Sequence, residues 1–266
     1  KAGVDPNKIL KNSSITFIVT EVKRSLDYID FINKHTLPES SIIVASKGFS
    51  GNCTLLPDVL KEKTINRSIG VLTGPSFAHE VMAKKPTALT VAGNLKIIKL
   101  VTDVLHSNNL RIYGSSDVVG ASISGSMKNV IAIACGFVSG LKLGENARAA
   151  IWTRGLSETA RLVLALGGKV ETVFGLAGAG DMALSCFSGS SRNFSWGYAY
   201  ALNKNFEDVL VEGINAAQEA HLLAKKLNID MPITELVAKT SKSRLDLLDE
   251  AVKLLERPPT SEWIEK

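Results

Sequence analysis

The chain has 266 residues, which is enough for one large domain or two ordinary ones, each with a substantial apolar core. Apolar residues make up 45% and charged residues 21%, close to the averages for folded soluble domains, which excludes a disordered, collagen-like or acidic solvating chain. The net charge is only +5 and no Lys/Arg block occurs, so charge alone indicates no nucleic-acid or membrane surface.

The first part of the chain alternates strand-like and helix-like segments. Runs rich in β-branched and apolar residues predict strands over residues 15–22, 41–46, 68–73, 87–92 and 110–113. Helical spacing predicts helices over residues 24–34, 55–62, 76–84 and 95–105, the third of them capped by Ser76. Strands and helices that alternate at these lengths predict βαβ units and a parallel sheet.

The pattern changes near Asp117, after which no convincing strand occurs. Residues 118–141, 146–166, 213–227, 233–241 and 245–255 all have the spacing of helices. We therefore expect an α/β domain over residues 1–116 and an all-helical domain over residues 117–266, with the boundary at about residues 114–118.

Cysteine and histidine indicate neither disulfides nor metal. The three cysteines are widely spaced without a C-x-x-C pair, the four histidines are scattered, and we expect no metal. The longest strongly apolar run, residues 130–138, falls short of the ~20 residues of a spanning helix. The chain begins with Lys1 and not with Met, so we expect it to be incomplete, and the lack of a signal peptide says little about targeting.

Lys128 carries the strongest single functional signal. It is the one charged side chain in the 24 residues 118–141, which are otherwise small or apolar. Loss of hydration there would lower its pKa and suit it to proton transfer. The alternative is a lysine that reaches the helix surface, but an exposed helix would carry more charges, which favours function.

Two further segments follow predicted strands, where open α/β sheets bind ligands. Lys47 comes directly after the strand over residues 41–46, although an ordinary loop lysine is the better explanation of this feature alone. Gly74, Pro75 and Ser76 lie between a strand and a helix, where free amides could hold an anion. A plain turn with a Ser cap explains that segment equally well.

Two glycine- and serine-rich segments lie in the helical half. Residues 178–183 match the dinucleotide pattern G-x-G-x-x-A, but their flanks lack the required strand. We interpret them as a flexible turn that lets Asp181 reach a cleft; a simple connecting loop explains them as well. Residues 188–193 combine small donors with Arg192, the preferred bidentate partner of phosphate, but alone would read as a solvated loop.

Taken together and in order, these segments resemble the NAD-dependent glycerol-3-phosphate dehydrogenase family over nearly the whole chain. The residues that carry the resemblance form eight ordered motifs, at positions 45–48, 74–78, 125–130, 146–150, 174–181, 191–193, 211–213 and 231–234. Chance does not produce such a set. The resemblance implies an incomplete Rossmann-type domain followed by a helical substrate domain of the 6-phosphogluconate-dehydrogenase-like type, with the site in the cleft between them.

The resemblance also implies a reaction, the interconversion of dihydroxyacetone phosphate and sn-glycerol 3-phosphate with NAD or NADP, which supplies glycerolipid synthesis. It makes Lys128 the acid/base group, with Lys47 and Asp181 beside it; Lys47 would lower the pKa of Lys128 and Asp181 would raise it. The implied substrate-binding residues are Gly74, Ser76, Asn129, Ser191, Arg192 and Asn193. The implied cofactor-binding residues are Lys47, Ala78, Arg192, Leu210 and Glu212. A homodimer in the cytoplasm is expected, with an organellar location left open, and neither a membrane nor a nucleic acid as partner.

Three departures from the family pattern stand out. The Gly-rich fingerprint and first βαβ unit are absent from this sequence, Thr20 stands where the family often has Pro, and Ser122 stands where it usually has Glu. The selector for NADH or NADPH belongs to the missing part, so the choice between them stays open. Two rivals remain: a 3-hydroxyacid or 6-phosphogluconate type dehydrogenase, and a non-catalytic binding protein that lost its cofactor site.

Overall fold

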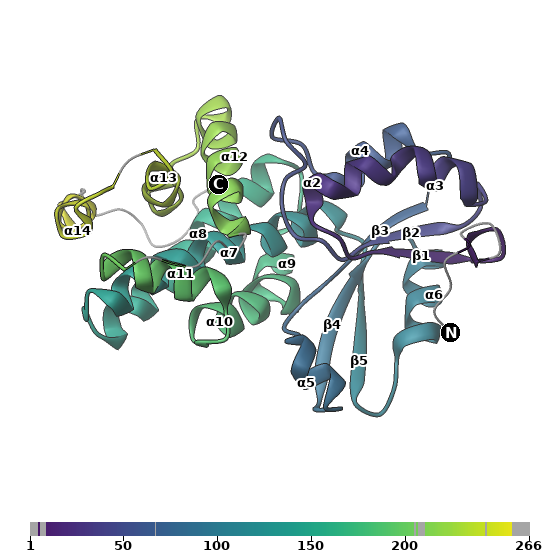
Figure 1. The fold of residues 1–266 in the computed structure, drawn as a ribbon, viewed down its shortest axis with the longest axis horizontal. Helices are drawn as coiled ribbons and strands as arrows, with labels where there is room; N and C mark the ends of the chain where they lie inside the picture. The colour runs from purple at the N-terminus through teal and green to yellow at the C-terminus, as the bar shows by residue number, and fades with distance from the viewer. Residues whose placement is uncertain are drawn as a thin grey trace.

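The computed structural model describes residues 5, 9–66, 68–204, 206, 211–242 and 244–256. A five-stranded sheet forms the first half, in the order β1 (Ile15–Ile18), β2 (Ser41–Val44), β3 (Ser68–Thr73), β4 (Thr87–Ala92) and β5 (Leu110–Ser115). Figure 1 shows this sheet on one side of the molecule and a bundle of helices on the other. The alternation of strands and helices therefore predicted the architecture correctly.

The sheet is mixed, which corrects the expectation of a parallel one. β1, β2 and β3 are parallel, β3 and β4 are antiparallel, and β4 and β5 are again parallel. The reversal follows from the connection after β3, where the short helix α5 (Ala78–Met82) turns the chain back without crossing the sheet. The carboxyl ends of β1, β2 and β3 therefore share one edge of the sheet.

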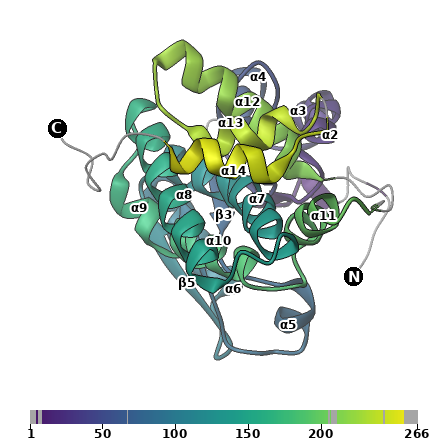
Figure 2. The ribbon, with the colours of Figure 1, turned by 90° about the vertical axis from the view of Figure 1, so that its left-hand side faces the viewer.

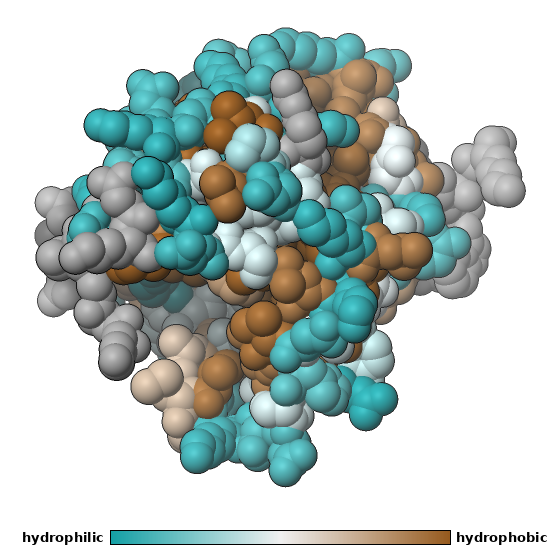
Figure 3. Space-filling model, turned by 90° about the vertical axis from the view of Figure 1, so that its right-hand side faces the viewer, coloured by the Kyte–Doolittle hydropathy of each residue, from teal (hydrophilic) through white to brown (hydrophobic). Residues whose placement is uncertain are grey.

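Helices cover both faces of the sheet, and alternate side chains of each strand enter different cores. Ile42 and Val44 pack with Leu56 and Leu60, beneath the helices α2 (Val22–Ser25), α3 (Ile29–His35) and α4 (Leu56–Lys63). Ile43 faces the other way, in a cluster with residues of β4, β5 and α6 (Leu95–Leu105). Brown apolar side chains also gather on the surface at this end of the molecule (Figure 3), where Leu95 and Val104 are exposed.

The second half is helical, as predicted. The predicted helices are found as α7 (Val118–Gly140), α8 (Glu145–Ala165), α12 (Glu212–Leu227), α13 (Pro232–Lys239) and α14 (Leu247–Leu255). Figure 2 shows these helices gathered in one bundle, in which α7 contacts α8, α10, α11, α12 and α13. By length and apolar composition α7 could cross a membrane, but 78% of its most apolar stretch is buried inside the protein.

Four helical segments escape the sequence pattern: α9 (Val170–Phe174), the π-helical turn η2 (Leu176–Gly180), α10 (Asp181–Cys186) and α11 (Arg192–Ala201). The interpretation of residues 178–183 as a flexible turn is therefore wrong, since η2 runs directly into α10. Gly178 permits this path, because a Cβ there would lie 2.0 Å from the carbonyl oxygen of Val173. The predicted Ser76 cap is also wrong: α5 starts at Ala78, and the Ser76 hydroxyl donates to the Gly74 carbonyl.

Glycines let α7 and α11 touch backbone to backbone. A Cβ at Gly136 would lie 2.3 Å from the Phe194 carbonyl oxygen, and a Cβ at Gly197 would lie 2.2 Å from that of Ile133. Neither position therefore accommodates a side chain unless the helices separate. This contact joins the helix of Lys128 to the helix of Arg192.

A buried carboxylate holds α13 against α8. Glu158 is 1% exposed and accepts hydrogen bonds from the Ile233 and Thr234 backbone N–H groups and from the Thr234 hydroxyl, at 2.6–3.0 Å. These bonds satisfy donors at the start of α13 that the helix itself leaves free. Burial outweighs them and raises the pKa of Glu158 to about 7.

Glu158→Gln should flatten the pH dependence of unfolding. With a folded pKa of about 7 against 4.5 when unfolded, protonated Glu158 stabilises the fold below about pH 4.5, and this contribution is lost as the pH rises through 7. Gln does not titrate, so the variant should lack this decline, on the order of 3 kcal/mol across the full range. Chemical unfolding at pH 5 and pH 8 measures it; an equal decline in both proteins would contradict the assignment.

Candidate active site

One buried carboxylate joins two lysines from different parts of the chain. Lys47 Nζ donates to Asp181 Oδ2 at 2.6 Å, and Lys128 Nζ donates to Asp181 Oδ1 at 2.7 Å. The Asp181 side chain is 1% exposed, whereas those of Lys47 and Lys128 are 21% and 13% exposed. The three residues singled out in the sequence therefore form one cluster, in which two cations face a single anion.

The pKa of the Lys128 ammonium is set by opposing effects of burial and of its charged neighbours. Burial lowers its pKa most, the nearby Lys47 cation lowers it further, and Asp181 raises it, with the balance at about 8. Lys128 is thus poised to bind or release a proton near neutral pH, as its apolar sequence surroundings predicted. It does not snorkel to the helix surface, because its ammonium bonds to a buried carboxylate.

Close packing sets the place of each member of the cluster. Lys47 leaves β2 at the carboxyl edge of the sheet, and its side-chain stem crosses α7 at Gly125, where a Cβ would lie 3.5 Å from Lys47 Cγ. Asp181 is the first residue of α10, and the preceding Gly180 lies against Pro75. Pro75 therefore brings the segment of residues 74–76 next to the start of α10.

Gly74 itself is required by its surroundings. Its φ is +132°, and a Cβ there would come within 3.2 Å of the Leu89 Cα on β4. A side chain would be strained at this position and would separate β3 from β4. Near it, the buried hydroxyls of Thr73 and Ser124 have no hydrogen-bond partner among the described residues.

A second network links three helices through two asparagines. Asn193 Nδ2 donates to Asn129 Oδ1 at 2.9 Å, and the Gly213 N–H donates to Asn193 Oδ1 at 3.0 Å. In this network Asn129 takes part through its amide oxygen. Ser191 caps α11 by accepting from the Phe194 N–H at 3.4 Å, and Arg192 follows as its first residue, exposed to solvent.

Glu212 opens α12 beside the cluster. Burial raises its pKa, while the cations Arg192, Lys128 and Lys47 lower it. Glu212 is therefore within electrostatic range of Arg192 and of both lysines of the cluster.

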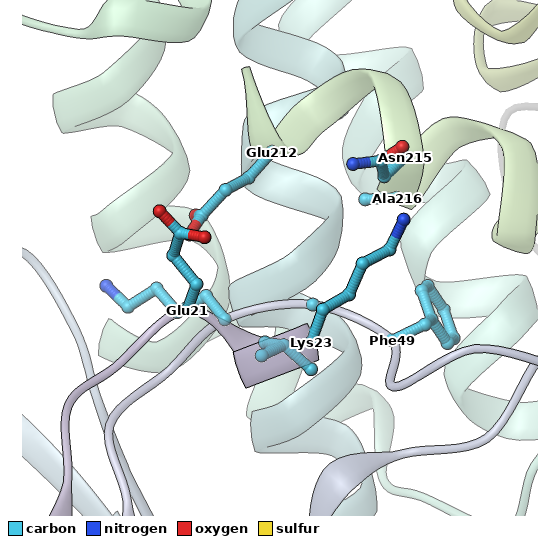
Figure 4. A pocket seen from close by; sticks show the side chains of 9 residues that line it. Glu21, Lys23, Phe49, Glu212, Asn215 and Ala216 are labelled. Atoms are coloured by element: carbon cyan, nitrogen blue, oxygen red, sulfur yellow. The ribbon is translucent and has the colours of Figure 1, made fainter. Parts of the chain in front are cut away.

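A pocket adjoins Glu212 and brings in residues that the sequence did not single out. Its lining comes from the starts of α2 and α12 and from the segment after β2: Glu21, Val22, Lys23, Lys47, Gly48, Phe49, Glu212, Asn215 and Ala216. Figure 4 shows the carboxyl groups of Glu21 and Glu212 pointing toward one another, while Lys23 extends toward Asn215 on the other side of the view. In the sequence, the one indication that these residues belong to a site is their position at the starts of helices beside the Lys47 segment.

The remaining predicted residues are not drawn into the cluster by a direct contact. Ala78 is exposed at the start of α5, and Leu210 lies outside the described residues. At the two departures, the Thr20 carbonyl accepts from the Ser46 hydroxyl at 2.5 Å, which braces the ends of β1 and β2. The Ser122 hydroxyl donates to the Val118 carbonyl of its own helix at 2.7 Å.

Comparison with known proteins identifies the family. Residues 1–98 match the model of the NAD-dependent glycerol-3-phosphate dehydrogenase N-terminus, and residues 117–251 match that of the C-terminus. The chain is 39% identical to glycerol-3-phosphate dehydrogenase [NAD(P)+] of Polynucleobacter asymbioticus, covering 95% of this chain and 78% of the relative. The chain belongs to the NAD-dependent glycerol-3-phosphate dehydrogenase family.

Two further relatives agree with this assignment. The enzyme of the same name from Neisseria gonorrhoeae is 38% identical, over 95% of this chain and 80% of the relative. The crystal structure of glycerol-3-phosphate dehydrogenase from Coxiella burnetii superposes with a TM-score of 0.91 at 36% identity, over 97% of this chain and 81% of that one. The resemblance from eight motifs is confirmed, and neither the different dehydrogenase nor the non-catalytic binding protein is supported.

The pocket of this glycerol-3-phosphate dehydrogenase family member has a lining suited to a nicotinamide ring. Lys47, Glu21, Glu212 and Asn215 offer polar groups of both signs at a pocket that also has the apolar walls Val22, Phe49 and Ala216. A flat ring with a carboxamide requires such a mixture of surfaces. The residues present therefore suit the group at this end of the site.

Lys47→Met should move the pH profile of the dehydrogenase. Met retains most of the stem over Gly125 but removes a cation that lowers the pKa of Lys128. With protonated Lys128 as the proton donor, the role proposed below, we expect the alkaline limb of the rate of ketone reduction to move above pH 8. Steady-state rates from pH 6 to 10 measure the shift. An unchanged limb would show that Lys47 does not influence the titrating group.

Proposed function

We propose that Lys128, Lys47 and Asp181 are the catalytic residues with which this dehydrogenase interconverts dihydroxyacetone phosphate and sn-glycerol 3-phosphate. The observation that carries the proposal is the single buried carboxylate of Asp181, which holds both ammonium groups at 2.6–2.7 Å. NAD or NADP, when bound, transfers the hydride to or from the carbon of the substrate.

In the reducing direction, negative charge develops on the keto oxygen of the substrate. A protonated Lys128 stabilises that charge and donates its proton to the oxygen. Neutral Lys128 accepts the proton in the reverse direction. A pKa of about 8 makes both protonation states accessible near neutral pH. Asp181 holds the Lys128 ammonium in place. The Lys47 cation keeps the pKa of Lys128 low enough for its proton to be released.

We assign the other predicted residues to the substrate and the cofactor. Arg192 and Ser191 at the start of α11 would bind the substrate phosphate, and the amides of Asn129 and Asn193 would bind its oxygens. Gly74 and Ser76 would line the substrate side from the end of β3. On the cofactor side we place Lys47, Arg192 and Glu212, together with Ala78 and Leu210. The division into a dinucleotide-binding domain (1–116) and a substrate-binding domain (117–266) belongs to the same proposal.

The oligomeric state, cellular location and metabolic role of the enzyme are also part of the proposal. We infer a homodimer located in the cytoplasm, which acts on a small phosphorylated substrate and supplies glycerol 3-phosphate for glycerolipid and phospholipid synthesis. Light scattering of the purified protein and fractionation of cells would test these two points.

A substrate panel tests the reaction. The full-length protein should oxidise NADH or NADPH when given dihydroxyacetone phosphate, followed by absorbance at the reduced nicotinamide band. A 3-hydroxyacid and 6-phosphogluconate serve as comparison substrates in the oxidising direction. Turnover of one of these, with none on dihydroxyacetone phosphate or glycerol 3-phosphate, would refute the proposed reaction.

A further inference from the structure

Arg148 and Trp152 lie one turn apart on α8 and hold the ring of Phe187 between them. The Arg148 guanidinium carbon lies over that ring, 5.0 Å from its centre. The Trp152 ring meets it edge-on, with 6.1 Å between centres and 65° between planes. Residues four apart share one face of a helix, so α8 presents both groups to Phe187 together.

Charge pairing alone does not account for Arg148. Its terminal nitrogens contact Glu145 and Ser139 at the rim of the bundle. Its buried Nε, like Trp152 Nε1, has no hydrogen-bond partner among the described residues. An arginine that only needed a counterion would remain in solvent, where all its donors are satisfied. The planar face of its guanidinium is used against Phe187.

Phe187 lies where α10 ends and the turn toward α11 begins. Its N–H closes α10 by donating to the Ala183 carbonyl at 3.0 Å, and α10 begins at Asp181, which holds both lysines. Five residues later the chain enters α11 at Arg192. The turn between them is braced internally, since the N–H of Ser191 donates to the Ser188 carbonyl and the Ser195 hydroxyl donates to that of Gly189.

The far end of this turn is fixed independently. Contact at Gly136 and Gly197 holds α11 on α7, the helix that carries Lys128. The turn of residues 188–191 is thus tied at one end to α8 through Phe187 and at the other end to α7. Arg192, the first residue of α11, lies where this turn joins the helix.

We propose that Phe187, held by Arg148 and Trp152, is a positioning residue that sets where Arg192 meets the phosphate of the substrate. The inference rests on the proposed function, in which Arg192 binds that phosphate. Loss of the ring would release the start of the turn without touching the Lys47–Asp181–Lys128 cluster. Binding of the phosphate should therefore weaken, while proton transfer remains intact.

Phe187→Ala in the full-length protein tests this. We expect the KM for dihydroxyacetone phosphate to rise about tenfold, with an unchanged alkaline limb near pH 8. The kcat/KM for dihydroxyacetone, which has no phosphate, should stay within twofold of the parent. Phe187→Tyr keeps the ring and should behave like the parent. Phe174→Ala removes a 58% exposed aromatic residue elsewhere in the same domain and is the matched control.

Arg148→Met separates a positioning role from general damage. It should raise the same KM, and the double variant with Phe187→Ala should be no worse than Phe187→Ala alone, because both act through one contact. Equal slowing with both substrates, or independent effects of the two substitutions, would overturn the proposal. If Phe187→Ala fails to fold, Phe187→Leu, which keeps bulk without the aromatic face, replaces it with the same expected pattern.

The same assay on Arg192→Lys distinguishes the two levels of inference. If that variant shows no phosphate-specific loss, the assignment of Arg192 in the proposed function is wrong. If it does and Phe187→Ala does not, only the positioning role of Phe187 is wrong.

Discussion

Lys128→Ala should lower kcat for reduction of dihydroxyacetone phosphate by at least ~10²-fold, the usual contribution of a positioned acid/base group. The variant loses the ammonium that Asp181 orients at 2.7 Å, and with it the group that donates the proton. The KM should change less than kcat, because this charge interacts most strongly with the oxygen as it becomes negative. Steady-state kinetics at pH 7 measure the loss.

The pH dependence of the parent enzyme gives the matching signature. With a pKa of about 8, Lys128 is protonated below that pH, so ketone reduction should decline above pH 8 and alcohol oxidation should rise toward it. Both limbs should vanish in Lys128→Ala. A folded variant with near-parental kcat, or one that keeps the same limb, would exclude Lys128 as the proton donor.

Arg192→Lys should raise the KM for dihydroxyacetone phosphate and lower kcat/KM, by ~2–4 kcal/mol for a charged contact that becomes largely desolvated when the substrate binds. Lysine keeps the charge but loses the planar fork that binds two phosphate oxygens at once. Grip on the phosphate also fixes the keto carbon, so kcat should fall as well. Initial rates over a range of substrate concentrations measure both effects.

Dihydroxyacetone without phosphate is the control for Arg192. It should react poorly with the parent enzyme and be little affected by the substitution. A similar loss with both substrates would mean that Arg192 does not read the substrate phosphate, and that it acts on the cofactor or on the structure instead.

Much of the fold was predictable because apolar runs bounded by turn residues leave few alternatives. The bounds of β3, β4 and α6 agree with the prediction residue for residue, whereas β1 ends at Ile18 because Val22 already begins α2. α11 was missed because its aromatic residues at 194, 196, 198 and 200 alternate as in a strand. η2 and α10 were missed because glycine and alanine give no apolar period.

A site residue was predictable where its charge contrasts with apolar neighbours in the sequence, and not where its neighbours are polar as well. Lys128 is conspicuous as one charge among small and apolar residues, and the structure places it in the cluster with Lys47 and Asp181. Glu21, Lys23 and Asn215 are ordinary in a polar sequence, and only folding brings them to the cleft. The link from Asn129 through Asn193 to Gly213 joins three helices, which spacing along the chain cannot reveal.

The reversed direction of β4 determines where Lys128 can lie. β5 runs parallel to β4, so Ser115 at the end of β5 pairs with Ala92, which in turn pairs with Val71 inside β3. β5 therefore ends before it reaches the edge of the sheet at which β1, β2 and β3 end. α7 therefore begins at a distance from that edge and runs toward it. Along the helix, Gly125 meets Thr73, and Lys128 lies about 15 Å from Val118 at 1.5 Å per residue. Were all five strands parallel, α7 would start at the edge and carry Lys128 away from it.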